Sequence, residues 1–231
     1  MPERFAIVVA GGKGLRMGSD IPKQFIPVGG MPVLMRTLRR LSDWDAAMTL
    51  VLVLPVAQQD YWQTLCRDYA FAVPHTVVAG GDTRFHSVLN GLRCVQTLTS
   101  APDALVAVHD GVRPFVSFEV LDRCFAVAAE QGAAVPVVPV VETLRELADV
   151  TADAPSVTRD RSRYRLVQTP QVFRLDLLTD AYRQPYRDAF TDDASVVEAL
   201  GHAVALTDGN RENIKLTTPY DLTIAAALCT I

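Results

Sequence analysis

Residues 5–24 read Phe-Ala-Ile-Val-Val-Ala-Gly-Gly-Lys-Gly-Leu-Arg-Met-Gly-Ser-Asp-Ile-Pro-Lys-Gln, and this stretch predicts the first strand and the first loop of the fold. The five apolar residues at its start are typical of a buried strand. The glycine-rich turn that follows carries two cations, Lys13 and Arg16. Glycine lets backbone N–H groups approach phosphate oxygens, and Lys or Arg neutralises their charge. We therefore expect this turn to bind a polyphosphate, namely a nucleoside triphosphate.

The residue sequence of the turn excludes two other kinds of phosphate-binding loop. A P-loop requires Gly-x-x-x-x-Gly-Lys-Ser/Thr, whereas Gly12-Lys13 is followed by Gly14. The dinucleotide fingerprint requires a glycine three residues after Gly14, where Met17 stands. The pattern that remains is Gly-Gly-x-Gly-x-Arg-Met, followed by Pro22-Lys23-Gln24. The alternative is an ordinary glycine loop with solvated charges, and the second motif argues against it.

Length and charge narrow the class of protein. A chain of 231 residues suits one sizeable α/β domain, or two small ones at most. Apolar residues make up 49% of the chain and charged residues 21%, which is typical of a soluble globular protein. Lys and Arg total 22 against 26 Asp and Glu, a formal charge of −4. Since there is no basic excess, we expect no nucleic-acid partner, and any anion site must be a local cluster of cations.

The cysteines and the apolar runs favour a cytoplasmic location. The four cysteines are scattered among apolar helical neighbours without a C-x-x-C pair, so we interpret them as reduced core residues: Cys66, Cys94, Cys124 and Cys229. The N-terminus has no signal-peptide pattern. Pro136, Pro139 or charged residues interrupt the longest apolar runs well short of a membrane span. We expect a cytoplasmic enzyme that has no membrane partner.

Apolar segments of strand length alternate with segments of helical periodicity. We expect strands at residues 5–9, 48–54, 76–79, 105–108 and 133–138. We expect helices at residues 32–41, 57–69, 83–95 and 117–130. Continuous apolar strands separated by helices indicate an α/β fold, in which helices cover both faces of a mainly parallel sheet.

The last third of the chain returns to a globular pattern at residues 168–173. A helix is expected from about Asp176, another at 191–200 and a strand at 203–206. The last helix is expected to start at Thr218, whose hydroxyl can cap it while Asp221 returns the bond.

Residues 139–166 differ from the rest, because they carry ten charged side chains and few apolar ones. Such a segment cannot bury a face of its own, so we interpret it as an excursion from the globular part of the chain, in the form of a β-arm. A disordered loop is the alternative. We expect Thr143-Leu144-Arg145 and Tyr164-Arg165-Leu166 to be the two strands of a hairpin.

Three motifs follow predicted strands, and ligands of open parallel sheets bind beyond the carboxyl ends of the strands. These motifs are Gly11–Arg16, Gly80–Arg84 and His109–Pro114. Asp110 emerges directly from a strand, where a carboxylate would repel phosphate unless it held a divalent cation such as Mg²⁺. A helix cap or an ion pair with Arg113 is the alternative for Asp110.

Lys215 and His109 are two further candidates for a chemical role. Lys215 is a lone cation between apolar neighbours on a short expected strand, and its alternative is a lysine that snorkels at a sheet edge. For His109 we expect a bond to the backbone and no catalytic role. The sequence has no Gly-x-Ser-x-Gly motif and no paired Cys and His, so nothing in it favours covalent catalysis.

The ordered motifs resemble those of the 2-C-methyl-D-erythritol 4-phosphate cytidylyltransferases of the non-mevalonate isoprenoid pathway, over essentially the full length. They are Ala10 to Met17, Pro22 to Gln24, Gly80 to Arg84 with Ser87-Val88, His109 to Pro114, Gln168 to Gln171, Thr191 to Ser195, and Asn213 to Lys215. Ribitol 5-phosphate cytidylyltransferases share most of these motifs and stay an alternative. A non-catalytic nucleotide-binding relative would be expected to have lost Lys23, Asp110 or Lys215, and all three are present.

The resemblance implies one domain over residues 1–231, with a Rossmann-like, glycosyltransferase-A-like nucleotidyltransferase fold from which residues 139–166 project as a β-arm. It implies transfer of CMP from CTP to 2-C-methyl-D-erythritol 4-phosphate, with Mg²⁺ as cofactor and 4-diphosphocytidyl-2-C-methyl-D-erythritol and pyrophosphate as products. It also implies a homodimer in which each arm reaches the active site of the neighbouring subunit. The family often has Ala where this chain has Gly11, Gly111 and Val112, which are small or backbone-directed changes.

Position in the family motifs implies a role for each of several residues. Nucleotide-binding roles fall to Ala10, Gly11, Gly12, Gly14, Gly81, Asp82, Ser87 and Asp110, and the last is also the Mg²⁺ ligand. Catalytic roles fall to Arg16, Lys23 and Lys215. Acceptor-binding roles fall to Arg113, Thr143, Arg161, Thr169, Thr191 and Lys215. Of these, Thr143 and Arg161 lie in the arm. Arg159 competes with Arg161 for its role, and spacing back from Thr169 favours Arg161.

The implied reaction needs no general base. The acceptor phosphate attacks the α-phosphorus of CTP in line, and pyrophosphate leaves. A phosphate monoester has its second pKa near about 6, so the nucleophile is already mostly dianionic at neutral pH. The difficulty is to bring anions together, so we expect Arg16, Lys23, Lys215 and Mg²⁺ on Asp110 to screen their repulsion.

Overall fold

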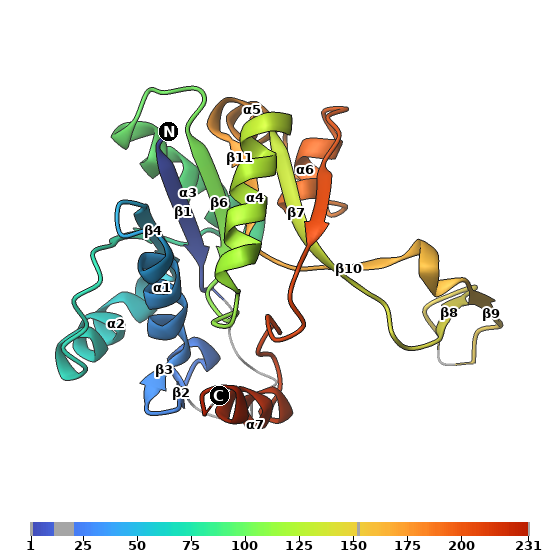
Figure 1. The fold of residues 1–231 in the computed structure, drawn as a ribbon, viewed down its shortest axis with the longest axis horizontal. Coiled ribbons are helices and arrows are strands. Elements are labelled where there is room, and N and C mark those ends of the chain that lie inside the picture. The colour runs from blue at the N-terminus through green and yellow to red at the C-terminus, as the bar shows by residue number, and fades with distance from the viewer. Residues whose placement is uncertain (1, 12–20, 152, 231) are drawn as a thin grey trace.

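Eight strands of the described residues form one sheet (Figure 1). The computed structural model describes residues 2–11, 21–151 and 153–230. The strands are β1 (Arg4–Val9), β4 (Thr49–Leu54), β5 (Thr76–Ala79), β6 (Leu105–Asp110), β7 (Ala133–Pro139), β10 (Arg165–Val167), β11 (Gln171–Arg174) and β12 (Ala205–Asp208). They follow the order β10-β7-β11-β6-β1-β4-β5, and β12 pairs with β7.

The middle of the sheet is parallel. β1 pairs in parallel with β4 and with β6, so that Ile7 lies between Val51 and Val108. All three side chains are fully buried, as expected for parallel strands covered on both faces. Only β10 and β11 run against the others, each antiparallel to β7. The predicted α/β fold with a mainly parallel sheet is therefore confirmed.

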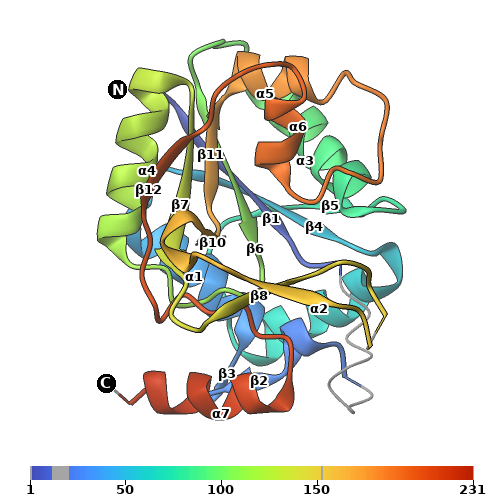
Figure 2. The same cartoon turned by 90° about the vertical axis from the view of Figure 1, so that its right-hand side faces the viewer.

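Helices cover both faces of the sheet (Figure 2). They are α1 (Val33–Trp44), α2 (Val56–Asp68), α3 (Arg84–Leu98), α4 (Phe118–Gln131), α5 (Leu175–Ala181), α6 (Asp193–Glu198) and α7 (Pro219–Leu228). Ala6 and Val8 of β1 are buried with residues of α1, α2 and α4. Phe5 and Ile7 are buried with residues of α3, α5 and α6. Successive strand residues point to opposite faces, so one strand contributes to two cores.

A third, smaller cluster anchors the chain that precedes α7. Leu216 is buried together with Val28, Val33 and Ala225. Val28 belongs to β2 (Pro27–Val28), which pairs with β3 (Met31–Pro32) just before α1. Lys215 therefore precedes a residue that is fixed in an apolar core.

Side-chain caps set the starts of the helices near the carboxyl edge of the sheet. The Thr218 hydroxyl accepts a bond from Asp221 N, and the Asp221 carboxylate accepts one from Thr218 N, which confirms the predicted cap of the last helix. A similar capping box at Asp192 starts α6 later than expected, and Gly201, at φ +83°, follows its end. The helix expected at 191–200 is thus shorter, and the strand expected at 203–206 lies at 205–208.

The charged segment forms a β-arm that projects beyond β7 and β10 (Figure 1). Its hairpin pairs β8 (Leu144–Leu147) with β9 (Ser156–Arg159), and Leu144 lies opposite Arg159. The expected pairing of 143–145 with 164–166 is therefore wrong. Residues 165–167 instead form β10 along the free edge of β7, because a returning apolar segment can add to an exposed strand there.

In the part of the chain that the structure describes, no helix is long and apolar enough to cross a membrane. Cys124 is buried on α4, whereas the other three cysteine thiols are only half-buried. Burial raises the pKa of the Cys124 thiol to about 11. The cytoplasmic location stays a prediction.

Candidate active site

A cavity of about 460 Å³ opens where β1, β4, β5 and β6 end. This volume is in the range of small-molecule sites. The cavity is lined by Val9, Ala10, Gly11, Lys23, Gln24, Pro55, Val56, Gly80, Gly81, Asp82, Thr83, Arg84, Ser87, Asp110, Val112 and Lys215. The fold thus brings parts of the three predicted strand-end motifs to one place.

The turn after β5 approaches α3 very closely. Gly81 N donates a hydrogen bond to Ser87 Oγ at 3.0 Å. A Cβ atom on Gly81 would lie 2.4 Å from His86 Cβ, so any larger residue would displace the start of the helix. Thr83 caps α3 by accepting a bond from His86 N. The glycine is required here because two backbone segments meet.

A buried glutamine holds Lys23 at the cavity. The Gln24 side chain is 1% exposed, and its Nε2 donates to Ala10 O at 3.0 Å and to Gln58 Oε1 at 2.7 Å. These bonds tie the short helix η2 (Lys23–Phe25) to the end of β1. Gln24 belongs to the predicted motif Pro22-Lys23-Gln24, but no role was predicted for it.

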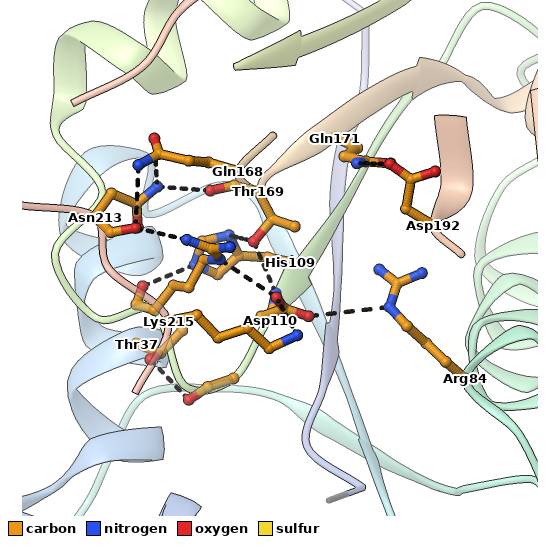
Figure 3. Close-up of polar contacts among 12 residues, drawn as sticks. Thr37, Arg84, His109, Asp110, Gln168, Thr169, Gln171, Asp192, Asn213 and Lys215 are labelled. Carbon is orange, nitrogen blue, oxygen red and sulfur yellow. Dashed lines mark hydrogen bonds and ion pairs between the residues drawn. The ribbon is translucent and has the colours of Figure 1, made fainter. Parts of the chain in front are cut away.

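Three cations surround the Asp110 carboxylate at the end of β6 (Figure 3). Lys215 Nζ lies 3.0 Å and Arg113 Nε 3.3 Å from Oδ2, while Arg84 Nε lies 4.0 Å from Oδ1. Burial alone would raise the pKa of Asp110, but Lys215, Arg84 and Arg113 together lower it to about 2. The carboxylate is therefore ionised at neutral pH. The ion pair with Arg113, which was the alternative for Asp110, is present.

His109 is part of a buried hydrogen-bond chain (Figure 3). Asp110 N donates to Thr169 Oγ1 at 3.0 Å, and Thr169 Oγ1 lies 3.0 Å from His109 Nδ1. His109 Nε2 lies 3.0 Å from Arg113 O, which can only accept, so Nε2 carries the proton and Nδ1 accepts from Thr169. Burial lowers the pKa of His109 to about 4 and keeps the ring neutral. The expectation of a backbone bond is confirmed.

The segment that carries Lys215 is fixed by buried amides rather than by a strand, so the expected strand is absent here. Asn213 Nδ2 donates to Thr169 O at 2.8 Å, and Arg113 donates to Asn213 O at 2.7 Å. Gln168 Nε2 donates to Asn210 O at 2.9 Å. These bonds explain why the Lys215 side chain reaches Asp110 from a segment without regular structure.

The predicted site residues fall into four groups. Lining the cavity are Ala10, Gly11, Lys23, Gly81, Asp82, Ser87, Asp110 and Lys215. Behind Asp110 lie Arg113 and Thr169. Exposed and not lining the cavity are Thr143, Arg161 and Thr191. Outside the described residues lie Gly12, Gly14 and Arg16.

Arg84 is a residue of the site for which the sequence motifs predict no role. It lines the cavity as the first residue of α3, and its NH2 group lies 2.6 Å from Asp193 Oδ2. It belongs to the predicted motif Gly80–Arg84, but its buried partner Asp193 stands 109 positions later in the chain.

Comparison with known proteins gives consistent matches. A family model described as 2-C-methyl-D-erythritol 4-phosphate cytidylyltransferase matches residues 5–230. A protein of that name from Bacteroides thetaiotaomicron is 60% identical over 222 residues, which cover 96% of this chain and 97% of that protein. The crystal structure of the Thermus thermophilus protein of that name is 34% identical, with a TM-score of 0.76, and the match covers 99% of this chain and 100% of that one. The Francisella tularensis structure is 29% identical, with a TM-score of 0.79, and the match covers 96% and 98%.

The buried neutral His109 gives an expected pH dependence of stability. Its pKa is about 4 in the folded chain and 6.5 ordinarily, so only the unfolded chain gains a proton between these values. The free energy of unfolding should therefore fall as the pH falls, by about 2 kcal/mol between pH 7 and pH 5. Urea unfolding at the two pH values should show this loss in the wild type and a much smaller loss in His109→Gln. The exposed His202→Gln serves as control and should behave as the wild type; equal losses in all three would contradict the assignment.

Proposed function

The chain belongs to the 2-C-methyl-D-erythritol 4-phosphate cytidylyltransferase family, and we propose that the cavity at the carboxyl edge of its sheet is the active site. The protein is a nucleotidyltransferase that transfers CMP from CTP to 2-C-methyl-D-erythritol 4-phosphate. The products are 4-diphosphocytidyl-2-C-methyl-D-erythritol, an intermediate of isoprenoid biosynthesis, and pyrophosphate. The observation that carries the location is the convergence of Lys23, Asp110 and Lys215 on one cavity.

We assign the nucleoside to the glycine-rich side of this cavity. Gly81 and Ser87, which are hydrogen-bonded to each other, form one wall, and Asp82 lies beside them. Ala10 and Gly11, which follow β1, line the same cavity. A Cβ atom on Gly11 would meet no described atom within 4 Å, which fits the Ala that the family often has there. Gly12 and Gly14 belong to the same proposed site by motif position.

The triphosphate is assigned to Arg16 and Lys23, and the acceptor phosphate to Lys215. Positive groups placed around the reacting phosphates stabilise the charge that builds on them in the transition state. The acceptor phosphate is already mostly dianionic, so the reaction calls for no general base. His109 suits this scheme, because both of its ring nitrogens are engaged and burial keeps the ring neutral.

The residues at the cavity fit a magnesium ion held mainly by the substrate. Mg²⁺ commonly takes one or two protein carboxylates together with phosphate oxygens and waters. Asp110 supplies one ionised carboxylate, and its Oδ1 lies 4.0 Å from Arg84 Nε, beyond hydrogen-bond distance. No group of three or more His, Cys, Asp or Glu side chains suited to a metal occurs in the described residues. We therefore assign Asp110 as the ligand of an ion that would neutralise phosphate charge.

We propose that the arm, residues 139–166, makes the protein a homodimer and carries Thr143 and Arg161 to the neighbouring subunit's acceptor site. Apolar side chains on the arm are unusually exposed for a monomer: Val150 is 97% and Val157 58% exposed. Arg113, Thr169 and Thr191 complete the proposed acceptor set.

Of the two candidate arginines, Arg161 suits the acceptor role better. Arg159 is paired across the hairpin with Glu146, which balances its charge. Arg161 donates to the backbone oxygen of Val141, so its positive charge has no carboxylate partner in the described arm.

Substrate choice can be tested directly. The protein with CTP and Mg²⁺ should release pyrophosphate rapidly with 2-C-methyl-D-erythritol 4-phosphate and at background rate with ribitol 5-phosphate. Pyrophosphate release is followed for each acceptor separately, and a reaction without acceptor sets the background. Faster release with ribitol 5-phosphate would replace the proposed function by the alternative.

Lys23→Ala should slow turnover at least about 100-fold with the fold intact, because loss of one electrostatic donor raises the barrier by about 2.7–4 kcal/mol. The rate of pyrophosphate release and the circular dichroism spectrum are measured together. Arg67→Ala, which removes a surface cation on α2, is the control and should keep the wild-type rate. Near-normal turnover of Lys23→Ala would refute its role.

Sharing of the site between subunits predicts recovery of activity in mixed dimers. Lys215→Ala and Arg161→Ala should each be strongly impaired alone, whereas their co-expression should restore about a quarter of wild-type activity, since half of the random dimers have one intact site. Co-expression of Lys215→Ala with Lys23→Ala is the control, because both residues lie in the same subunit's site and no recovery is expected. Absence of recovery in the first pair would contradict the shared site.

A further inference from the structure

Arg84 lies between the carboxylates of Asp193 and Asp110 and is much closer to that of Asp193. Its NH2 group is 2.6 Å from Asp193 Oδ2, a direct hydrogen-bonded ion pair. Its Nε atom is 4.0 Å from Asp110 Oδ1, too far for a hydrogen bond. The Arg84 side chain is 30% exposed at the cavity, whereas Asp193 is fully buried.

Asp193 is held rigidly from the other side. Its Oδ1 accepts a hydrogen bond from Tyr182 OH at 2.6 Å. The backbone around it is fixed by the Asp192 capping box and by Ala194 N, which donates to the buried Gln171 Oε1 at 2.8 Å. Both Asp193 oxygens are thus engaged, and the carboxylate keeps its place at the start of α6.

The two oxygens of Asp110 differ in what surrounds them (Figure 3). Oδ2 is contacted by Lys215 and Arg113, at 3.0 and 3.3 Å. Among the described contacts, Oδ1 is approached only by Arg84 Nε, in a long ion pair of 4.0 Å that is beyond hydrogen-bond distance. If Arg84 were drawn onto Oδ1, all of the carboxylate would be taken up by protein cations.

We propose that Asp193 is a positioning residue that holds Arg84 away from Asp110 and so leaves Asp110 Oδ1 open to the divalent cation. The inference rests on the proposed role of Asp110. Opposite charges attract strongly at 4 Å in a partly buried site, so the gap between Arg84 and Asp110 needs a competing anion. Asp193 is that anion. Arg84 then contributes positive charge to the cavity without occupying the ligand oxygen.

Removal of the Asp193 charge should weaken divalent-cation binding. In Asp193→Asn, Arg84 has no anion except Asp110 within reach among its described contacts, and it should close onto Oδ1. We expect the Mg²⁺ concentration for half-maximal transfer to rise at least about tenfold, as for other groups that orient metal ligands. Mn²⁺ binding to the CTP-bound protein, measured by electron paramagnetic resonance without acceptor, should weaken equally.

The double variant Arg84→Gln/Asp193→Asn separates positioning from a merely structural role. It removes the arginine that would occupy Oδ1, so Mn²⁺ affinity should return to within about threefold of the wild type, even if CTP binding weakens. Asp176→Asn is the matched control, since it removes a carboxylate paired with Arg174 in the first turn of α5, and it should leave both readouts unchanged.

Each outcome decides the matter. The inference would be overturned if folded Asp193→Asn bound Mn²⁺ as tightly as the wild type, or if the double variant bound it as weakly as Asp193→Asn. Either result would leave the proposed function standing, provided that the wild type transfers CMP. If the wild type transferred no CMP, the proposed function would fall and this inference with it. Should Asp193→Asn not fold, the double variant decides alone: affinity near that of the wild type supports the inference, and a tenfold loss overturns it.

Discussion

The ionised, buried carboxylate of Asp110 organises the carboxyl edge of the sheet. A buried charge is costly unless it is paired, and loss of one partner leaves an uncompensated ion. The partners of Asp110 come from widely separated parts of the chain: Arg84 starts α3, Arg113 follows β6 and Lys215 precedes α7. The ion pairs of one carboxylate therefore join three segments of the chain, and the site helps to stabilise this edge of the protein.

Much of the central fold could be predicted from the sequence, because its parallel strands are continuous apolar runs that periodicity detects. The arm shows where this reasoning stops. Residues 164–166 were expected to pair within a hairpin, but the strand here is 165–167 and it pairs with β7. The composition of a strand does not reveal which exposed edge it will meet in three dimensions. The hairpin partner of β8 is instead β9, where Arg159 and Glu146 form an ion pair across the strands.

The site could be predicted where a residue type at a strand end implies its chemistry, as for Asp110, or where a motif resembles one of a known family, as for Lys23. The orienting roles of Gln24, Thr169 and Arg84 were missed, although Thr169 was predicted to bind the acceptor, because each acts through a partner distant in sequence. Gln24 bonds to Ala10 and Gln58, Thr169 to His109, and Arg84 to Asp193. The local sequence pattern does not predict such pairs, because their members are brought together only by the folded sheet.

The placement of Lys23 and Lys215 in one cavity has a consequence for covalent modification. The sequence contains only one further lysine, Lys13, in the same glycine-rich motif as Arg16, and every other strong cation is an arginine. Arginine keeps its charge and is not a target of acetylation, whereas a lysine amine is. All lysine ε-amines of this polypeptide therefore lie in segments assigned to substrate binding. Acylation of even one of them should inhibit the enzyme, because the chain has no lysine elsewhere on its surface that could be acylated without effect.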